Sequence, residues 1–356
     1  MASVLLHRTA EPVYGSEASG LVRGRVALVT GAGGSIGSEI VRQLHRLEAA
    51  EVYYLDKDEY ALYRLQHELD GNGLLDDAHY LLADIANLAQ LQQIMDRVRP
   101  HLVFHAAAHK HLPLLEKSPA AAIITNVRGT ENVVRTAVRA GAELVVNIST
   151  DKAARPSSIL GMSKRLGEMI AAGYVGRGTR IASVRFGNVL GSRGSFLETL
   201  DLQIDGDRPI TITHPDVTRY FMTIPEAASL VIEAAVLAEA GETYVLDMGS
   251  PIRIMDVVAR FAEAVNRRLP RIVFTGLRPG EKMHEELYDP AEPRQSTSHS
   301  RISKVHVEDG FTGDPDVLRI EVDGLYRAVR LGLTPVELAD ELVRLIDANT
   351  QVGVAA

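Results

Sequence analysis

The turn that follows the first apolar segment constrains the fold more than any other feature of this sequence. Residues 26–29 form a continuous apolar run, and residues 30–37 read Thr-Gly-Ala-Gly-Gly-Ser-Ile-Gly. Apolar residues then recur at helical spacing, at Ile40, Val41, Leu44 and Leu47. A buried strand, a glycine-rich turn and an amphipathic helix in this order predict a parallel βαβ unit.

The same alternation of strand and helix continues along the first half of the chain. Further apolar strands are expected at residues 51–55, 80–84, 102–105 and 143–148, and a helical stretch precedes each of them. Strands that alternate with helices form a parallel sheet covered on both faces. We therefore expect an α/β protein with a doubly wound parallel Rossmann sheet and a smaller, interwoven α/β domain.

The second half of the chain is less regular and richer in glycine and proline. A helix at residues 226–239 and a strand at 243–246 are expected to return to the sheet. Thr334-Pro-Val-Glu337 is a capping box, and it predicts a final helix that is folded to about Ile346. We expect an N-terminal arm, a Rossmann domain and a second domain at residues 1–24, 25–186 plus about 222–250, and 187–221 plus 251–356, respectively.

Composition and charge exclude several classes of function. The sequence has no cysteine, so disulfides, thiol nucleophiles and cysteine-ligated zinc are excluded. Its 38 Lys and Arg against 46 Asp and Glu give a net charge of −8, which argues against nucleic acid as a partner. Because no apolar run reaches the roughly 18 residues of a membrane span, we expect a cytoplasmic protein without one.

The glycine turn also has the features of a dinucleotide site. Its backbone can approach a pyrophosphate, whose charge the N-terminus of the next helix stabilises. Asp56 ends the second strand, nineteen residues after Gly37, where it can accept hydrogen bonds from the adenosine ribose and repel a 2′-phosphate. We therefore expect NAD rather than NADP, although Lys57 opposes that preference. The expected cofactor-binding residues here are Gly31, Gly33, Gly34, Ser35, Ile36, Gly37 and Asp56.

Asp84 and Ile85 follow the third expected strand and are expected beside the adenine. An alternative for Asp84 is that it caps the next helix.

Six further motifs occur in order along the chain, at residues 105–113, 125–130, 149–152, 184–194, 213–223 and 277–282. Together with the glycine turn and Lys164, they resemble the extended short-chain dehydrogenases/reductases. More narrowly, they resemble the UDP-N-acetylglucosamine 4,6-dehydratases of the CapD-like polysaccharide-biosynthesis family. The resemblance implies NAD-dependent conversion of a UDP-sugar to its 4-keto-6-deoxy form. We also expect a homo-oligomer, a dimer or larger.

The resemblance assigns the chemistry to residues 149–152. By it, Lys152 is the base that removes the C5 proton, and Asp151 is the acid that protonates the leaving C6 hydroxyl. An ordinary lysine is charged and an ordinary aspartate ionised at neutral pH, so the reaction needs the proton-swapped neutral pair. Thr150 is expected to relay a proton or bind the C4 hydroxyl. Without the neighbouring motifs, Asp151 and Lys152 would be a solvated ion pair and Thr150 a loop cap.

The family motif Tyr-x-x-x-Lys is altered here, because Leu160 occupies the tyrosine position while Lys164 is retained. Lys164 is expected to hold the nicotinamide ribose, with Ala106 also at the cofactor; the alternative for Lys164 is an exposed helical lysine. The missing phenol resembles the dehydratases that retain configuration at C5. It leaves two alternatives open, a nucleotide-sugar 4-epimerase and a non-catalytic NAD-binding regulator.

Arginine presents a planar fork of donors that suits a diphosphate. The residues that we expect at the nucleotide-sugar are Lys110, His111, Arg185, Asn188, Arg193, Arg219, Arg278 and Glu281, with Glu116 nearby. The cluster His105, His109 and His111 does not have the spacing of a zinc site, so we expect no metal.

Overall fold

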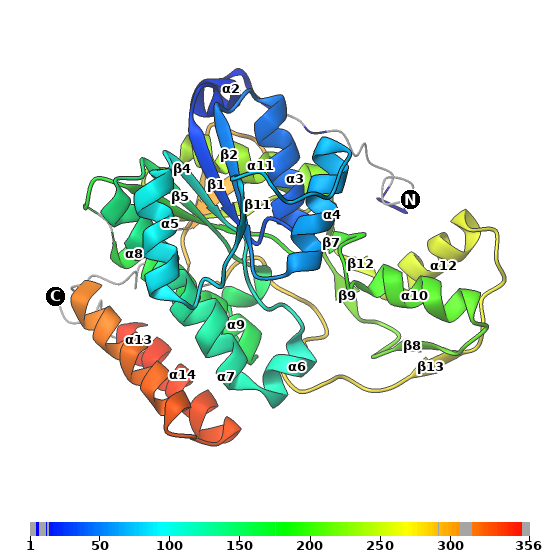
Figure 1. Cartoon of the computed structure of the whole chain (residues 1–356). Coiled ribbons are helices and arrows are strands. Elements are labelled where there is room, and N and C mark those ends of the chain that lie inside the picture. Colours follow the sequence, from blue (N-terminus) through cyan, green and yellow to red (C-terminus); the bar gives the residue numbers. More distant parts are fainter. Residues whose placement is uncertain are drawn as a thin grey trace.

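The computed structural model describes residues 5–6, 12, 14–174, 176–290, 292–305 and 315–350. A single large sheet with helices on both faces dominates these residues, and a smaller lobe lies beside it (Figure 1). The sheet strands are β1 (Val26–Thr30), β2 (Glu51–Asp56), β3 (Tyr80–Leu82), β4 (Leu102–His105), β5 (Leu144–Ile148), β6 (Arg180–Arg185), β11 (Ala240–Leu246), β14 (Arg294–Ser296) and β15 (Ile302–Val305).

The order of the strands is that of a doubly wound fold. They lie in the order β14-β15-β11-β6-β5-β4-β1-β2-β3, and the pairs from β3 to β11 are all parallel. β15 pairs antiparallel with β11, and β14 pairs antiparallel with β15. The expected doubly wound Rossmann sheet is therefore confirmed. The chain reverses its winding direction between β1 and β4, where ligands bind in folds of this type.

Helices cover both faces of the sheet and create two apolar cores. One face carries α2 (Ser16–Val22), α3 (Ser35–Arg46), α4 (Glu59–Asp70) and α11 (Ile224–Leu237). The other carries α5 (Leu88–Val98), α6 (Leu112–Lys117), α7 (Pro119–Ala122), the π-helix η1 (Ile123–Arg128), α8 (Gly129–Ala140) and α9 (Ile159–Gly173). In α3, Ile40, Val41 and Leu44 are fully buried, as their helical spacing predicts.

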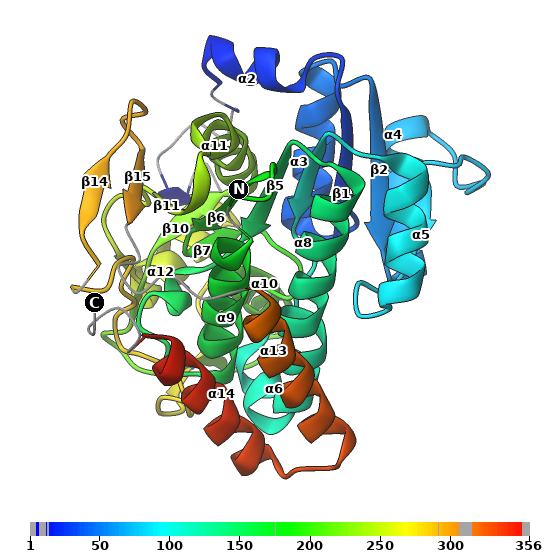
Figure 2. The ribbon, with the colours of Figure 1, turned by 90° about the vertical axis from the view of Figure 1, so that its left-hand side faces the viewer.

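The two C-terminal helices pack on the Rossmann unit. Figure 2 shows α13 (Pro315–Arg330) and α14 (Pro335–Thr350) lying against α9 and its neighbours. Leu325 and Leu342 are buried in the core of that face. We expect residues 251–356 to belong to the second domain. The structure differs, because β14, β15, α13 and α14 all join the large sheet or its helices. An amphipathic pattern predicts that a helix has an apolar face, but not which surface covers that face.

The capping box at Thr334 is present as expected. The Thr334 backbone N–H donates to Glu337 Oε2 at 2.7 Å, and the Glu337 N–H donates to Thr334 Oγ1 at 3.4 Å. α14 begins one residue later, with Pro335 in its first turn.

The smaller lobe has an apolar core of its own. It contains α10 (Phe196–Asp205), α12 (Ile254–Ala264) and three short strand pairs, and it lies to the lower right in Figure 1. The pairs join β7 (Asn188–Leu190) to β10 (Phe221–Thr223), β8 (Ile210–Ile212) to β13 (Ile272–Phe274), and β9 (Thr218–Arg219) to β12 (Ile252–Arg253). None of the helices in the described ranges is both long and apolar enough to cross a membrane.

Candidate active site

A cavity of about 700 Å³ opens at the carboxyl ends of the central strands, between the sheet and the first loop of the smaller lobe. It brings together sixteen of the residues that the sequence predicts for the site. They are Gly31, Gly34, Ser35, Ile36, Gly37, Asp56, Asp84, Ile85, Ala106, Lys110, His111, Thr150, Lys152, Lys164, Asn188 and Arg193. The predicted residues that are absent from its lining are Gly33, Asp151, Arg185, Arg219, Arg278 and Glu281, and Glu116, which is expected nearby, is absent as well.

The glycine turn is packed too tightly for side chains. Gly31 has a φ of +68°, and a Cβ atom there would lie 2.6 Å from the backbone nitrogen of Ala107. A Cβ atom on Gly37 would lie 2.1 Å from the carbonyl oxygen of Gly31. α3 starts after Gly34 without a side-chain cap, so its first N–H groups face the cavity unscreened. This end of α3 is therefore suited to bind a phosphate group.

Gly33 contacts helix α4 and does not line the cavity. A Cβ atom there would lie 2.4 Å from Ala61 Cβ, so Gly33 allows the turn to pack on α4 rather than lining the cavity.

Asp56 is held in place by backbone groups at the end of β2. Its Oδ2 accepts from the Gly33 N–H at 2.9 Å, and its Oδ1 accepts from the Asp58 N–H at 3.0 Å. The carboxylate also borders the cavity, so it can meet a ribose there. Lys57 Nζ lies 3.4 Å from His109 Nε2, so this amine has a partner other than Asp56.

Asp84 does not cap the next helix. Its Oδ1 accepts from the Ala86 N–H at 2.9 Å, whereas Asn87 caps α5 by accepting from the Gln90 N–H. Asp84 and Ile85 both border the cavity, which leaves the adenine position as the prediction.

The short 3-10 helix η2 (Asp151–Ala153) carries the polar centre of the site. The Thr150 hydroxyl donates to Asp151 Oδ1 at 2.8 Å, and Lys152 Nζ donates to the same oxygen at 2.9 Å. The Asp151 N–H donates to the Phe186 carbonyl at 3.1 Å, which ties this turn to the end of β6. The Asp151 side chain is only 1% exposed, so it reaches the cavity through Thr150 and Lys152, which line it.

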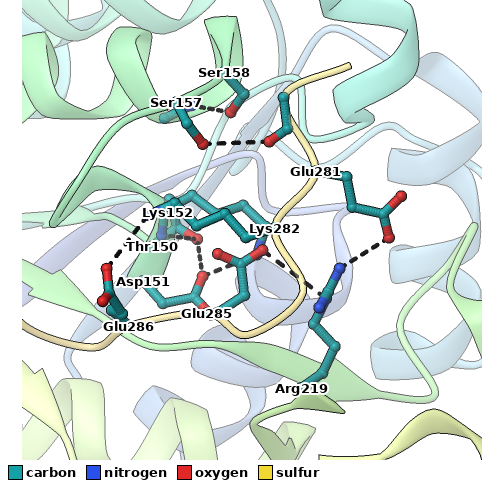
Figure 3. A network of polar contacts seen from close by, with 12 residues as sticks. Thr150, Asp151, Lys152, Ser157, Ser158, Arg219, Glu281, Lys282, Glu285 and Glu286 are labelled. Atoms are coloured by element: carbon teal, nitrogen blue, oxygen red, sulfur yellow. Dashed lines mark hydrogen bonds and ion pairs between the residues drawn. The ribbon is translucent and has the colours of Figure 1, made fainter. Parts of the chain in front are cut away.

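A second carboxylate, which the sequence reasoning missed, lies beside Lys152. Figure 3 shows Glu285 next to Lys152 and Arg219, with Glu281 on the other side of Arg219. Glu285 Oε1 is 3.5 Å from Lys152 Nζ and 3.9 Å from Arg219 Nε, and Arg219 donates to Glu281 Oε1 at 2.8 Å. The available signal was that Glu285 follows the motif at residues 277–282 by three positions.

The two carboxylates set the charge of Lys152. Burial opposes the ammonium form, but Asp151 and Glu285 together outweigh burial, so the pKa of Lys152 lies above its usual value. Arg219 acts in the opposite direction but is weaker. Lys152 is therefore an ammonium ion that bridges two carboxylates.

Lys164 borders the cavity with Leu160, one turn earlier on α9. Lys164 is 8% exposed, which excludes the alternative of a solvated helical lysine. Burial lowers the pKa of Lys164 to about 8, although Glu168 opposes this shift. Leu160 is 7% exposed and presents an apolar surface to the cavity.

The expectation for Arg185 is wrong. Its guanidinium is fully buried and forms ion pairs with Glu168 and Glu292, at 2.7 Å and 2.6 Å. A phosphate cannot reach it. Strand β6 points this side chain into the interior, which the motif at residues 184–194 did not reveal.

The other residues expected at the nucleotide-sugar lie in different positions: some line the cavity, some lie beside it, and one is exposed to solvent. Lys110 Nζ donates to the Arg193 carbonyl at 2.6 Å, which joins the loops on either side of the cavity. Arg219 and Glu281 lie next to the site and pair with each other, and Arg278 is exposed on its loop. Glu116 accepts from the Ile159 N–H at 2.8 Å, at the start of α9.

His105 is a structural histidine. Its ring nitrogens bond the hydroxyls of Thr30 and Thr130 at 2.7 Å and 3.0 Å, and burial lowers the pKa of His105 to about 3. Within the described ranges, no group of three or more His, Cys, Asp or Glu residues could hold a metal ion.

Comparisons with known proteins show which proteins this chain is similar to. The family model described as "Polysaccharide biosynthesis protein" matches residues 27–307. The chain is 43% identical over 323 residues to the probable polysaccharide biosynthesis protein EpsC of Bacillus subtilis, which covers 89% of this chain and 53% of that protein. It is 40% identical over 301 residues to the capsular polysaccharide biosynthesis protein CapD of Staphylococcus aureus, covering 83% and 50%. The chain thus spans about half the length of these two relatives.

A third relative has a different named activity. The UDP-glucose 4-epimerase of Rickettsia bellii is 31% identical over 271 residues, covering 74% of this chain and 77% of that protein.

Solved structures share the fold. The structure of Pen from Bacillus thuringiensis superposes with a TM-score of 0.74 at 31% identity, covering 80% of this chain and 90% of that one. DesIV of Streptomyces venezuelae, a dTDP-glucose 4,6-dehydratase with NAD and TYD bound, gives a TM-score of 0.67 at 22% identity, covering 74% and 88%. At that identity, the second likeness shows the fold alone.

Proposed function

This chain belongs to the polysaccharide biosynthesis protein family, and from that premise we propose that it catalyses NAD-dependent 4,6-dehydration of a UDP-sugar. UDP-N-acetylglucosamine is the proposed substrate, and the 4-keto-6-deoxy sugar with retained C5 configuration is the proposed product. One observation carries the proposal: the joined pair Asp151 and Lys152 adjoins the same cavity as the glycine turn. An elimination needs an acid and a base at one place, beside a redox cofactor.

The cavity fits a dinucleotide. The N–H groups at the start of α3 would hold the pyrophosphate, Asp56 the adenosine ribose, and Lys164 the nicotinamide ribose. NAD, when bound there, supplies the acceptor for the C4 hydride and later returns that hydride to C6.

The residues of η2 divide the proton transfers. Thr150 faces the cavity and donates to Asp151, so it can pass the C4 hydroxyl proton to that carboxylate. Lys152 removes the C5 proton, which the C4 ketone makes acidic. Asp151 then protonates the C6 hydroxyl through Thr150, and water leaves. Lys110, His111, Asn188 and Arg193, which also line the cavity, are proposed to bind the UDP portion.

Two alternatives remain in competition. A 4-epimerase would use the same cofactor site, and the Rickettsia relative carries that name. It has no use for an elimination pair, however, and its chemistry depends on the phenol that Leu160 replaces. A non-catalytic NAD-binding regulator would also lack that phenol, but it would not need Asp151 and Lys152 joined beside the cavity.

A single product analysis separates these functions. We expect incubation with UDP-N-acetylglucosamine and NAD to give a new C6 methyl signal in the proton NMR spectrum. An inverted C4 centre would identify an epimerase instead, and an unchanged sugar would favour the regulator.

Asp56 is expected to make the protein prefer NAD. Hydrogen bonds from the Gly33 and Asp58 N–H groups hold its carboxylate in place. The carboxylate would therefore repel a 2′-phosphate on the adenosine ribose. Calorimetry should show NAD binding at least about tenfold tighter than NADP, or about 1.4 kcal/mol. Asp56→Asn removes the charge but keeps an oxygen for the Gly33 N–H, so it should narrow this difference. Asp96→Asn, an exposed change on α5, should leave it as it is.

A further inference from the structure

The proposed dehydration leaves the proton of the Lys152 ammonium group without an acceptor. Leu160 cannot take the C4 hydroxyl proton, so that proton passes through Thr150 to Asp151, the carboxylate to which Thr150 donates. Lys152 must lose its own proton before it can accept one from C5. Asp151 cannot serve both needs at once, because one carboxylate holds one proton. A third group must therefore hold the Lys152 proton during the elimination.

We propose that Glu285 is this third group, a proton depot that frees Lys152 to act as the base. The inference rests on the proposed function and extends it by one residue from the far side of the site. It gives this carboxylate, which no motif assigns, a defined step in the reaction.

The geometry supports the assignment. Lys152 lies between Asp151 Oδ1 at 2.9 Å and Glu285 Oε1 at 3.5 Å, so its ammonium group can turn from one carboxylate to the other. The Glu285 side chain is 3% exposed, which keeps a proton on it from exchanging freely with solvent. Figure 3 shows this row of groups.

The charges around Lys152 keep the depot empty until it is needed. The charged groups that face Lys152 are Asp151 on its own turn, Glu285 on the loop after β13, and Arg219 on β9. Burial opposes the charge on Lys152, but Asp151 and Glu285 outweigh burial and hold the pKa of Lys152 above its usual value. Arg219 lies 3.9 Å from Glu285 and also pairs with Glu281. In the resting site, the proton therefore stays on Lys152.

The proton count then closes. The C4 hydroxyl proton moves through Thr150 to Asp151, and the Lys152 proton moves to Glu285. Lys152 accepts the C5 proton, the electron pair of the C5–H bond forms the C5–C6 double bond, and the C6–O bond breaks. Asp151 gives its proton through Thr150 to the departing oxygen, so one water leaves.

The second half of the cycle restores every group. The hydride taken from C4 returns to C6, and Lys152 gives a proton to C5. Glu285 then returns its proton to Lys152. Asp151 and Glu285 end ionised and Lys152 ends charged, as they began.

The test separates oxidation at C4 from elimination. Glu285→Gln keeps the size of the side chain and an oxygen facing Lys152, but it cannot store the proton. With UDP-N-acetylglucosamine deuterated at C5, we expect deuterium loss and product formation to fall about a hundredfold. Reduced cofactor, followed by its absorbance in a single turnover, should still form at the wild-type rate and should accumulate. NAD affinity, measured by calorimetry, should be unchanged.

Glu286→Gln is the matched control. Glu286 is the next residue, and it pairs with Arg155 and Lys282 instead of Lys152. We expect wild-type turnover from it. Glu285→Asp, which restores a carboxylate, should recover part of the activity even if Glu285→Gln lowers stability.

A pH series adds a readout that a purely structural role would not change. Solvent can take the Lys152 proton at high pH, so the deficit of Glu285→Gln should shrink as pH rises. Equal turnover in Glu285→Gln and Glu286→Gln would refute the proposed role of Glu285. The same conclusion would follow if the loss of turnover in Glu285→Gln did not change with pH and oxidation at C4 were also slowed. A wild type that forms no 6-deoxy product would instead refute the proposed function.

Discussion

Lys152→Met is expected to abolish the loss of the C5 proton, with a decrease of at least about a hundredfold in product formation. The variant keeps the length of the side chain but removes the only amine that both contacts Asp151 and borders the cavity among the described residues. Hydride transfer from C4 does not use this amine, so reduced cofactor should still form. Exchange of C5 hydrogen with deuterated solvent, followed by NMR, measures the missing step directly.

Lys282→Met is the control for this experiment. Lys282 belongs to the same polar network, but it donates to the Arg155 carbonyl at 2.8 Å and pairs with Glu286, away from the cavity. We expect wild-type exchange from it. If Lys152→Met exchanges C5 hydrogen as fast as Lys282→Met does, Lys152 is not the base.

Local spacing was enough to predict the strand, the glycine turn and the position of Asp56 at the end of the next strand. Gly31, Gly37 and Asp56 belong to one strand-turn-helix-strand unit, and the steric and hydrogen-bonding demands of that unit fix these residue types. The capping box at Thr334 was predictable for the same reason, because its two partners are three residues apart. The fold class followed from the alternation of strand and helix.

The partners of Lys152 could not be predicted in this way. Glu285 reaches Lys152 from a loop more than a hundred residues away in the chain, and nothing in its local sequence marks it as buried. Arg185 was expected at the nucleotide-sugar because the guanidinium of an arginine suits a diphosphate, yet its ion pairs with Glu168 and Glu292 keep it in the interior. Long-range ion pairs depend on which elements meet, and residue types alone do not specify this.

The buried cluster around Arg185 gives the largest expected effect on stability. Arg185 and Arg165 share the carboxylates of Glu168 and Glu292, so two cations balance two anions in the interior. Burial alone would raise the pKa of Glu168, but Arg185 and Arg165 outweigh it and hold that pKa below its usual value. Ser149 also donates to Glu168 at 2.5 Å, so the cluster supports the strand end that precedes η2.

Glu168→Gln should therefore lower the free energy of unfolding at pH 7 by about 3 kcal/mol, because it leaves a buried guanidinium with too few anions. The sign of the pH dependence follows from the depressed pKa. The stabilisation by Glu168 is complete above its unfolded pKa of about 4.3 and is lost as pH falls further, so the two proteins should converge in acid. Denaturant unfolding at several pH values measures both effects.

Glu48→Gln provides the comparison for this last experiment. Glu48 pairs with Arg23 at 2.8 Å, a distance similar to those in the buried cluster, but both side chains are more than 60% exposed at 65% and 67%. Water solvates either charge when its partner is lost, so the unfolding free energy should change by less than about 0.5 kcal/mol. A Glu168→Gln protein as stable as Glu48→Gln would show that Arg185 finds solvent or another anion, and that the cluster does not hold β6 against α9.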